Sequence, residues 1–164
     1  HKDPAVRSEL VAGLAAAAGA GGMVGGQMID ISPERSELDL DGVTELQAMK
    51  TGALFGFACQ AGAILGGADE AARTALQAYS DDLGLAFQIA DDLLDAEGSE
   101  AELGKPTGQD AAAGKATFVG LMGVERARKR AAELAESAAA HLELFGDKAD
   151  LLQQTARFAV ERRS

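Results

Sequence analysis

Three aspartates stand close together in the segment Phe-Gln-Ile-Ala-Asp-Asp-Leu-Leu-Asp, residues 87–95. In a helix with about 3.6 residues per turn, four polar side chains of this segment share an arc of about 100° on the helix surface: Gln88, Asp91, Asp92 and Asp95. Carboxylates this close raise each other's pKa unless a cation lies between them. Oxygen ligands on a rigid helix suit Mg²⁺, which keeps several waters and shares its remaining positions with phosphate oxygens. The segment therefore predicts a magnesium site.

Lysines flank the aspartates along the sequence. Lys50, followed by Thr51, interrupts an apolar stretch. Lys105 and Lys115 follow the aspartates in a region that contains glycine and proline. A metal-bound diphosphate needs cations as well, because its negative charges must be balanced from both sides, so the lysines favour a diphosphate site. The alternative is that the acidic helix end is solvated surface and that Lys50 extends to solvent or pairs with a carboxylate.

Helices are the elements that must position these residues. Asp3 followed by Pro4 is typical of a helix start, and apolar periodicity with glycine stops indicates the later helices. The predicted helices cover residues 4–18, 43–66, 68–95, 118–145 and 150–163. The glycine-dense segment 23–30 predicts a close approach of backbone to another helix or to a ligand, and residues 32–42 and 98–117 are predicted loops. No alternation typical of strands occurs, so the predicted fold is all-α, a single unit over residues 1–164.

Composition narrows the classes of partner. Hydrophobic residues make up 47% of the 164 residues and aromatic residues 4%, which indicates one domain with a core of small aliphatic side chains. A net charge of -11 disfavours nucleic acid, because proteins that bind phosphate backbones carry a basic face. With no run of about 18 uninterrupted apolar residues, we expect no membrane span. The single cysteine, Cys59, cannot form an internal disulfide, so we expect a reduced core thiol and a cytoplasmic location.

Several motifs, in one order, resemble the C-terminal half of the trans-isoprenyl diphosphate synthase family, particularly the bacterial members that make farnesyl diphosphate. They are Gly-Gly-Gln-Met-Ile-Asp at 25–30, Lys-Thr-Gly-Ala-Leu at 50–54, Gly-Leu-Ala-Phe-Gln-Ile-Ala-Asp-Asp-Leu-Leu-Asp at 84–95, Gly-Lys at 104–105, Gly-Gln-Asp at 108–110 and Gly-Lys-Ala-Thr-Phe at 114–118. Together the motifs extend over nearly the whole chain. The resemblance implies that the chain is part of the isoprenoid synthase helical bundle.

The resemblance also implies roles for the charged residues. The aspartates of residues 91–95 correspond to the family's second aspartate-rich motif, which holds Mg²⁺ against the diphosphate of the allylic substrate. Lys50 and Lys105 correspond to the lysines that contact this diphosphate directly. Lys115 either approaches the same site or caps the helix that follows it.

Further roles follow from the same resemblance for uncharged and neighbouring residues. Thr51 and Gln88 lie where the family stabilises the developing allylic cation. Phe87 is expected to line the isoprenoid cavity. Gln27 and Asp30 match a further polar motif near the site.

The implied reaction is a head-to-tail condensation of two diphosphate esters. Metal and lysines stabilise the departing diphosphate, an allylic carbocation forms, and the double bond of isopentenyl diphosphate attacks it. Loss of a proton then gives farnesyl diphosphate. A synthase for geranylgeranyl diphosphate is the close alternative, and a non-catalytic partner subunit is an alternative of another class. Family members are usually homodimers.

One part of the family pattern has no counterpart in the chain. The family's first aspartate-rich motif, its paired arginines and most of its isopentenyl diphosphate site belong to an N-terminal half. We therefore expect residues 1–164 to be the C-terminal portion of a synthase domain. Because one acidic motif holds only part of the family's metal cluster, we also expect this portion alone to be inactive in prenyl transfer.

Overall fold

The computed structural model describes residues 1–97 and 114–162. Within these ranges it contains helices and no strand, which confirms the all-α prediction. The α-helices are α1 (Pro4–Ala18), α2 (Met23–Asp30), α3 (Leu40–Gln47), α4 (Ala53–Leu65), α5 (Glu70–Glu97), α8 (Phe118–Met122), α9 (Val124–His141) and α10 (Asp150–Glu161). Two 3-10 helices, Pro33–Glu37 and Glu143–Ala149, and one π-helical segment, Ala48–Gly52, complete the described elements.

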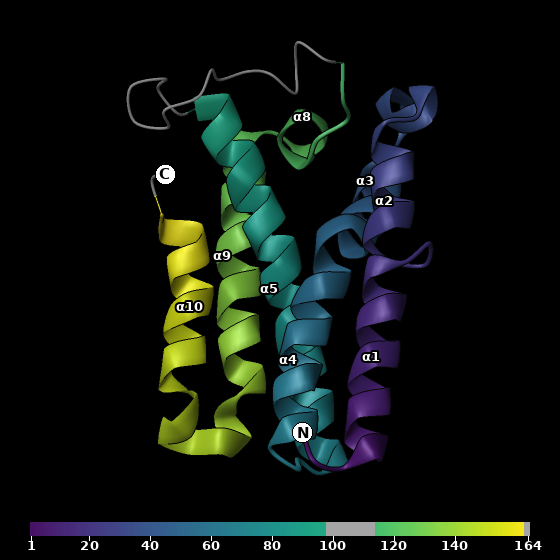
Figure 1. Ribbon diagram of the computed structural model, residues 1–164. Coiled ribbons are helices and arrows are strands. Elements are labelled where there is room, and N and C mark those ends of the chain that lie inside the picture. The colour runs from purple at the N-terminus through teal and green to yellow at the C-terminus, as the bar shows by residue number, and fades with distance from the viewer. Residues whose placement is uncertain (98–113, 163–164) are drawn as a thin grey trace.

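The long helices lie side by side along the length of the molecule, in the order α1, α4, α5, α9 and α10 (Figure 1). Helix α5 is central and contacts both α4 and α9. The C-terminal end of α5 lies at the same end of the molecule as α2, α3 and α8 (Figure 1), and α8 contacts both α3 and α5. The aspartates of α5 and the glycine-dense α2 are therefore brought to one end of the bundle.

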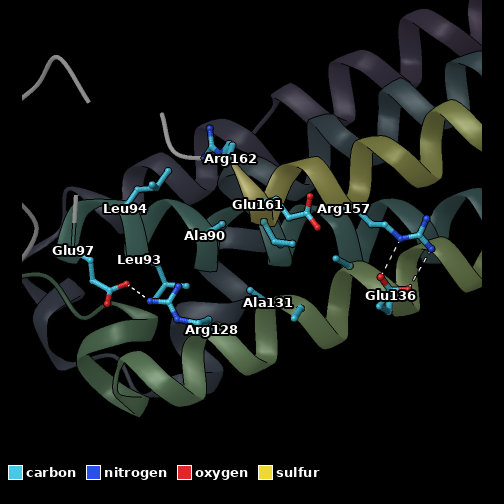
Figure 2. Close-up of a pocket in the computed structure, with 13 residues that line it drawn as sticks. Ala90, Leu93, Leu94, Glu97, Arg128, Ala131, Glu136, Arg157, Glu161 and Arg162 are labelled. Atoms are coloured by element: carbon cyan, nitrogen blue, oxygen red, sulfur yellow. Dashed lines mark hydrogen bonds and ion pairs between the residues drawn. The ribbon is translucent and has the colours of Figure 1, made fainter. Parts of the chain in front are cut away.

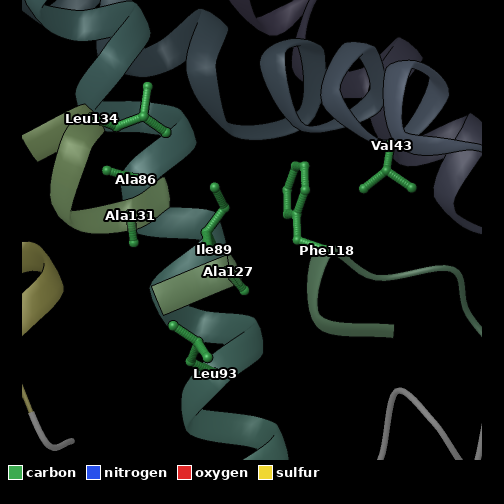
Figure 3. Packing of buried hydrophobic residues seen from close by; sticks show 8 residues of the cluster. All are labelled: Val43, Ala86, Ile89, Leu93, Phe118, Ala127, Ala131 and Leu134. Carbon is green, nitrogen blue, oxygen red and sulfur yellow. The ribbon is translucent and has the colours of Figure 1, made fainter. Parts of the chain in front are cut away.

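The core consists of small aliphatic side chains with few aromatic rings, as the composition predicts. Figure 3 shows the cluster that joins α3, α5, α8 and α9: Val43, Ala86, Ile89, Leu93, Phe118, Ala127, Ala131 and Leu134. The ring of Phe118 is 1% exposed and lies between Val43 and the helices α5 and α9 (Figure 3). This ring fixes the start of α8 against the rest of the bundle.

The start of the second long helix differs from the prediction. Residues 32–42 were expected to be a loop, but Pro33–Glu37 form a 3-10 helix and α3 begins at Leu40. The earlier start is explained by Asp39, whose side chain accepts a hydrogen bond of 2.9 Å from the amide of Gly42 and so caps the helix.

The predicted single helix over residues 118–145 is wrong in two places. Gly123, with φ of 82°, separates α8 from α9, and α9 ends at His141. Gly146, with φ of 54°, then kinks the 3-10 segment that leads to α10. Both glycines adopt a left-handed conformation that other residues rarely accept, so the chain turns at these points.

Cys59 lies at the core, as expected from the sequence. Cys59 is half-buried and packs against the core cluster that contains Tyr79. Burial, with the charge of Asp81, raises the pKa of the Cys59 thiol, so the thiolate is disfavoured. Burial also raises the pKa of Tyr79 to about 12, and the Tyr79 hydroxyl donates a hydrogen bond of 2.9 Å to the carbonyl of Leu152. Both side chains are core groups.

Two stretches, Pro4–Asp30 and Leu40–Leu65, are long and apolar enough by composition alone to cross a membrane. The first is divided into α1 and α2, and the 15 residues of α1 extend about 22 Å, less than the hydrocarbon core of about 30 Å. The second carries Lys50, whose ammonium is bonded to Asp30. These features favour helices of a folded bundle, and the absence of a membrane span stays a prediction.

Candidate functional site

A π-helical turn carries Lys50 and Thr51. It occupies Ala48–Gly52, between α3 and α4, where the sequence predicted an uninterrupted α-helix. Such turns add a residue to the helix and are frequent at functional sites. The turn lies directly against α5, because a Cβ atom added to Gly84 would stand 3.3 Å from the Cα of Gly52.

The glycine-dense helix α2 approaches the same turn from the other side. A Cβ atom added to Gly26 would lie 2.4 Å from the backbone nitrogen of Lys50 and 2.7 Å from its Cα. This contact confirms the predicted close approach of backbones at this segment. It also places Asp30, one turn further along α2, beside the side chain of Lys50.

Gly26→Ala is expected to destabilise the fold by about 1–3 kcal/mol, because the added methyl group overlaps backbone atoms that cannot move independently of their helix. Gly62→Ala is the matched control, since Gly62 lies in α4 with no atom within 4 Å of an added Cβ. That change should be neutral or stabilise by up to about 1 kcal/mol. Urea unfolding of both variants tests the contact, and equal stability of the two would contradict it.

Four charged side chains meet where α2, the 3-10 helix Pro33–Glu37, the π turn and the start of α8 come together: Asp30, Arg35, Lys50 and Lys115. We call them the basic cluster. The Nε of Arg35 lies 3.1 Å from Oδ1 of Asp30, and the Nζ of Lys50 lies 2.7 Å from Oδ2. The Nζ of Lys115 lies 3.7 Å from the same Oδ2. One buried carboxylate thus gathers three cations.

The cations keep the carboxyl of Asp30 ionised. Burial alone would raise its pKa, but the hydrogen bonds from Lys50 and Arg35 and the charges of Lys50 and Lys115 outweigh this effect. The pKa of Asp30 is therefore lower than its ordinary value of 3.8.

Residues 115–118 connect the basic cluster to the aspartates of α5. A guanidinium nitrogen of Arg35 donates a hydrogen bond to the carbonyl of Ala116. Two residues later, the amide of Phe118 donates to Oδ2 of Asp92 at 2.7 Å, and Asp92 is 8% exposed. The segment therefore ties Asp92 to the cluster through a short run of backbone.

The two alternatives for Lys115 can now be compared in the structure. The cap of α8 is Thr117, whose hydroxyl accepts a hydrogen bond of 3.0 Å from the amide of Gly120. Lys115 instead directs its ammonium toward Asp30. Its contact with a diphosphate stays a prediction, and Lys105 lies outside the described residues.

A second connection joins the π turn to α5. The hydroxyl of Thr51 donates a hydrogen bond to the side-chain carbonyl of Gln88. The structure thus brings together two side chains that are 37 residues apart and that the resemblance places at one step of the reaction. Gln27, in contrast, is exposed on α2 and stays outside the described contacts of the basic cluster.

The three aspartates of α5 face different neighbours. Asp92 is bonded to the amide of Phe118, whereas Asp91, 43% exposed, lies 3.4 Å from a guanidinium nitrogen of Arg162. Asp95 is half-buried one turn after Asp91. In the ranges that the structure describes, no three acidic, histidine or cysteine side chains form a group that could hold a metal ion. The donors nevertheless fit Mg²⁺, which commonly takes one or two carboxylates and completes its shell with water and substrate phosphate.

Two arginines near the site were not predicted from the sequence. Arg35 is buried in the basic cluster. Arg162 lies over the ring of Phe87, 4.3 Å from its centroid, and Phe87 also packs against Phe55 with centroids 5.5 Å apart. The expected place of Phe87 in an isoprenoid cavity stays a prediction. The sequence signal for Arg35 was its position five residues after Asp30. The 3-10 helix Pro33–Glu37 brings the two side chains together, so this spacing indicates an ion pair only once that helix is known.

A wide groove of about 790 Å³ lies between α5, α9 and α10 (Figure 2). Two of its arginines pair with glutamates across the helices: Arg128 bonds to Glu97, and the Nε of Arg157 lies 3.0 Å from Glu136. Because glutamates of the chain itself engage these two arginines, the groove fits a diphosphate less well than the basic cluster does.

A second groove, of about 590 Å³, lies between α1, the helices α3 and α4, and α5. Glycine and alanine form much of its lining, with larger apolar side chains from Phe57 and Leu85. The polar lining residues are Thr44, Gln60, Gln77, Asp81 and Asp82. It borders Gly52, the residue after Thr51. The groove could therefore hold an apolar chain whose polar end binds at the π turn.

Comparisons with known proteins agree with this arrangement. The sequence pattern of the polyprenyl synthetase family matches residues 8–154. The farnesyl diphosphate synthase of Geobacillus stearothermophilus is 42% identical over 139 residues, which are 85% of this chain and 47% of that enzyme. The chain thus spans about half the length of the curated relatives it matches.

Solved structures share the fold. The apo structure of an FPP/GFPP synthase from Zymomonas mobilis matches with a TM-score of 0.84 and 49% identity, over 98% of this chain and 53% of that one. A polyprenyl synthase from Caulobacter crescentus, complexed with calcium and isoprenyl diphosphate, matches with a TM-score of 0.84 and 28% identity, over 95% of this chain and 60% of that one. The shared helical architecture and the match over residues 8–154 lead to one conclusion: the chain belongs to the polyprenyl synthetase family.

Proposed function

We propose that this chain supplies the allylic diphosphate site of a prenyltransferase that condenses an allylic diphosphate with isopentenyl diphosphate to farnesyl diphosphate. The proposal rests on two connections to α5: one from Thr51 of the π turn, and one from the basic cluster through residues 115–118. The Thr51–Gln88 hydrogen bond and the segment 115–118 hold lysines and aspartates at one end of the bundle. A substrate with several negative charges and a metal needs both kinds of group.

Different residues of the chain stabilise the two charges that form when the substrate ionises. Lys50, with Lys105 and Lys115, donates hydrogen bonds to the diphosphate and stabilises its growing charge. The oxygens of Thr51 and Gln88 face positive charge on the allylic carbon, and the groove beside Gly52 holds the prenyl chain away from water.

The aspartates of α5 are the proposed ligands of Mg²⁺. Asp91, Asp92 and Asp95 would hold the ion against the diphosphate, with Asp92 fixed by its bond to the amide of Phe118. The ion, when bound, neutralises charge on the leaving diphosphate. The Caulobacter relative, complexed with calcium and isoprenyl diphosphate, supports a divalent metal as the cofactor.

Two alternatives concern the product and the chemistry. A geranylgeranyl diphosphate synthase uses the same allylic site, and the residues described here serve either product. A non-catalytic partner subunit is the alternative of another class. The partly exposed charges of Lys50 and Asp91 speak against it, because a purely structural subunit has no need to keep them.

The exposed apolar side chains of α1 and α2 support a homodimer, which we propose for the whole enzyme in the cytoplasm. Helix α1 has no buried residue. The large exposed hydrophobic residues of α1, α2 and the residue after α2 are Val11, Leu14, Val24, Met28 and Ile31. Exposed apolar side chains in such number favour contact with another protein surface, either a second copy of the enzyme or the part of it that lies outside this chain.

Calorimetric titration of the 164-residue chain with pyrophosphate in the presence of Mg²⁺ tests the proposed site. We expect binding by the parent and an affinity at least about tenfold lower for Lys50→Met, because one charged hydrogen-bond donor is removed. Lys148→Met is the matched control, since Lys148 is exposed on the 3-10 helix before α10. A folded parent that does not bind, or equal losses in the two variants, would contradict the proposal.

A further inference from the structure

Arg35 and Lys50 hold opposite oxygens of Asp30 but differ in exposure. The side chains of Arg35 and Asp30 are each 6% exposed, whereas that of Lys50 is 32% exposed. A buried carboxylate is stable only while a charge or several hydrogen bonds compensate it. Asp30 and Arg35 thus form the interior ion pair of the basic cluster, and Lys50 is the partner that a solute can reach.

We infer that Arg35 is a positioning residue for diphosphate binding: it keeps Asp30 compensated when the ammonium of Lys50 turns from the carboxylate to the substrate. This inference rests on the proposed function. If Lys50 forms its hydrogen bonds with a diphosphate, Oδ1 of Asp30 still has its contact of 3.1 Å with Arg35. Without Arg35, the same movement would remove one of the direct hydrogen-bond partners of a buried anion and leave that anion facing the incoming diphosphate.

The chemistry of arginine suits this role. Its guanidinium has five N–H donors in a rigid plane and carries a delocalised positive charge. Arg35 uses this geometry on two acceptors, the carboxylate of Asp30 through Nε and the carbonyl of Ala116 through another nitrogen. The second bond holds the backbone next to Lys115, whose ammonium lies 3.7 Å from Asp30. One arginine thereby sets both the charge and the position of the groups around Lys50.

Calorimetry with pyrophosphate and Mg²⁺ on the 164-residue chain tests the inference through a charge-rescue experiment. Arg35→Met should bind pyrophosphate about tenfold more weakly than the parent, because Lys50 is then held by an undercompensated carboxylate. Arg35→Lys, which keeps the charge, should lose less. Adding Asp30→Asn to Arg35→Met should restore most of the affinity, since the buried charge that retains Lys50 is gone. Because the double change also relieves the instability of an unpaired buried carboxylate, the recovery supports a positioning role only if Arg35→Met is itself folded at the titration temperature.

Arg157→Met is the matched control, because Arg157 forms an exposed pair with Glu136 and should leave pyrophosphate binding unchanged. Circular dichroism melting of each variant verifies the folded state. Unchanged affinity in Arg35→Met, or a double variant no better than Arg35→Met, would overturn the inference while the parent still binds. A parent that does not bind pyrophosphate would overturn the proposed function itself and this inference with it.

Discussion

Asp30→Ala is expected to lower the free energy of unfolding of the chain by about 3–5 kcal/mol, the range for removing one partner of a buried ion pair. The change would leave Arg35, whose side chain is 6% exposed, without its carboxylate, and would leave Lys50 beside it. Repulsion between these cations adds to the loss of the hydrogen bonds. Urea unfolding at neutral pH measures the effect.

Asp41→Ala is the matched control for Asp30→Ala. Asp41 is exposed in the first turn of α3, where an acidic side chain contributes a few tenths of a kcal/mol through the helix dipole. The same change of chemistry is thus made outside the basic cluster. Comparable losses in the two variants would show that Asp30 is not a buried, compensated charge.

The same ion pair predicts a pH dependence. Because the pKa of Asp30 in the folded chain is lower than its ordinary value of 3.8, its stabilisation is complete above that value and is lost as the pH falls through the lowered pKa. The difference in unfolding free energy between the parent and Asp30→Ala should be constant from about pH 5 to 7 and shrink below about pH 3.8. A difference that grows on acidification would contradict the assignment.

The double variant Asp91→Asn/Asp95→Asn is expected to lower the affinity for pyrophosphate in Mg²⁺ by about 10–100-fold. The reason is that the variant lacks two of the carboxylates that would hold Mg²⁺, and the ion would neutralise charge on the diphosphate. Asp91 is 43% exposed and its pair with Arg162 is 3.4 Å long, so the fold should lose little stability. Without Mg²⁺ the sign changes, because removing two negative charges near an anion should leave binding equal or tighter.

Asp81→Asn/Asp82→Asn is the matched control for this pair. It removes the same number of negative charges from adjacent aspartates of α5, about ten residues before the motif. Its affinity for pyrophosphate in Mg²⁺ should stay close to that of the parent. Equal losses in both double variants would show that the effect is not specific to Asp91 and Asp95. The same loss with and without Mg²⁺ would show that these aspartates act without the metal.

Long periodic helices could be predicted well from the sequence. The helix expected over residues 68–95 is α5, Glu70–Glu97, because its apolar positions repeat over many turns and one error in phase would expose the core. The start of α3 was missed although Asp39 gave a local capping signal. The ends of the helix expected over 118–145 depended on the conformations of Gly123 and Gly146, which the apolar pattern does not report.

In the candidate site too, features set by the local sequence could be predicted, whereas features set by contacts between distant segments could not. The residue types of the candidate site could be named from motifs, and the pairing of Thr51 with Gln88 agrees with their common assignment. The π turn could not be predicted, because it accompanies backbone contacts with Gly26 and Gly84 on two other helices. The role of Arg35 depends on Ala116, 81 residues later, and no local pattern encodes such a contact.

A crystal structure of the chain grown with Mn²⁺ and pyrophosphate tests the central claim most directly, because Mn²⁺ gives an anomalous signal and takes oxygen ligands like those of Mg²⁺. We predict a metal peak among the carboxylates of Asp91, Asp92 and Asp95, with pyrophosphate oxygens between the ion and the Nζ of Lys50. Pyrophosphate bound at the Arg128 and Arg157 groove, or a metal peak away from the α5 aspartates, would contradict the account.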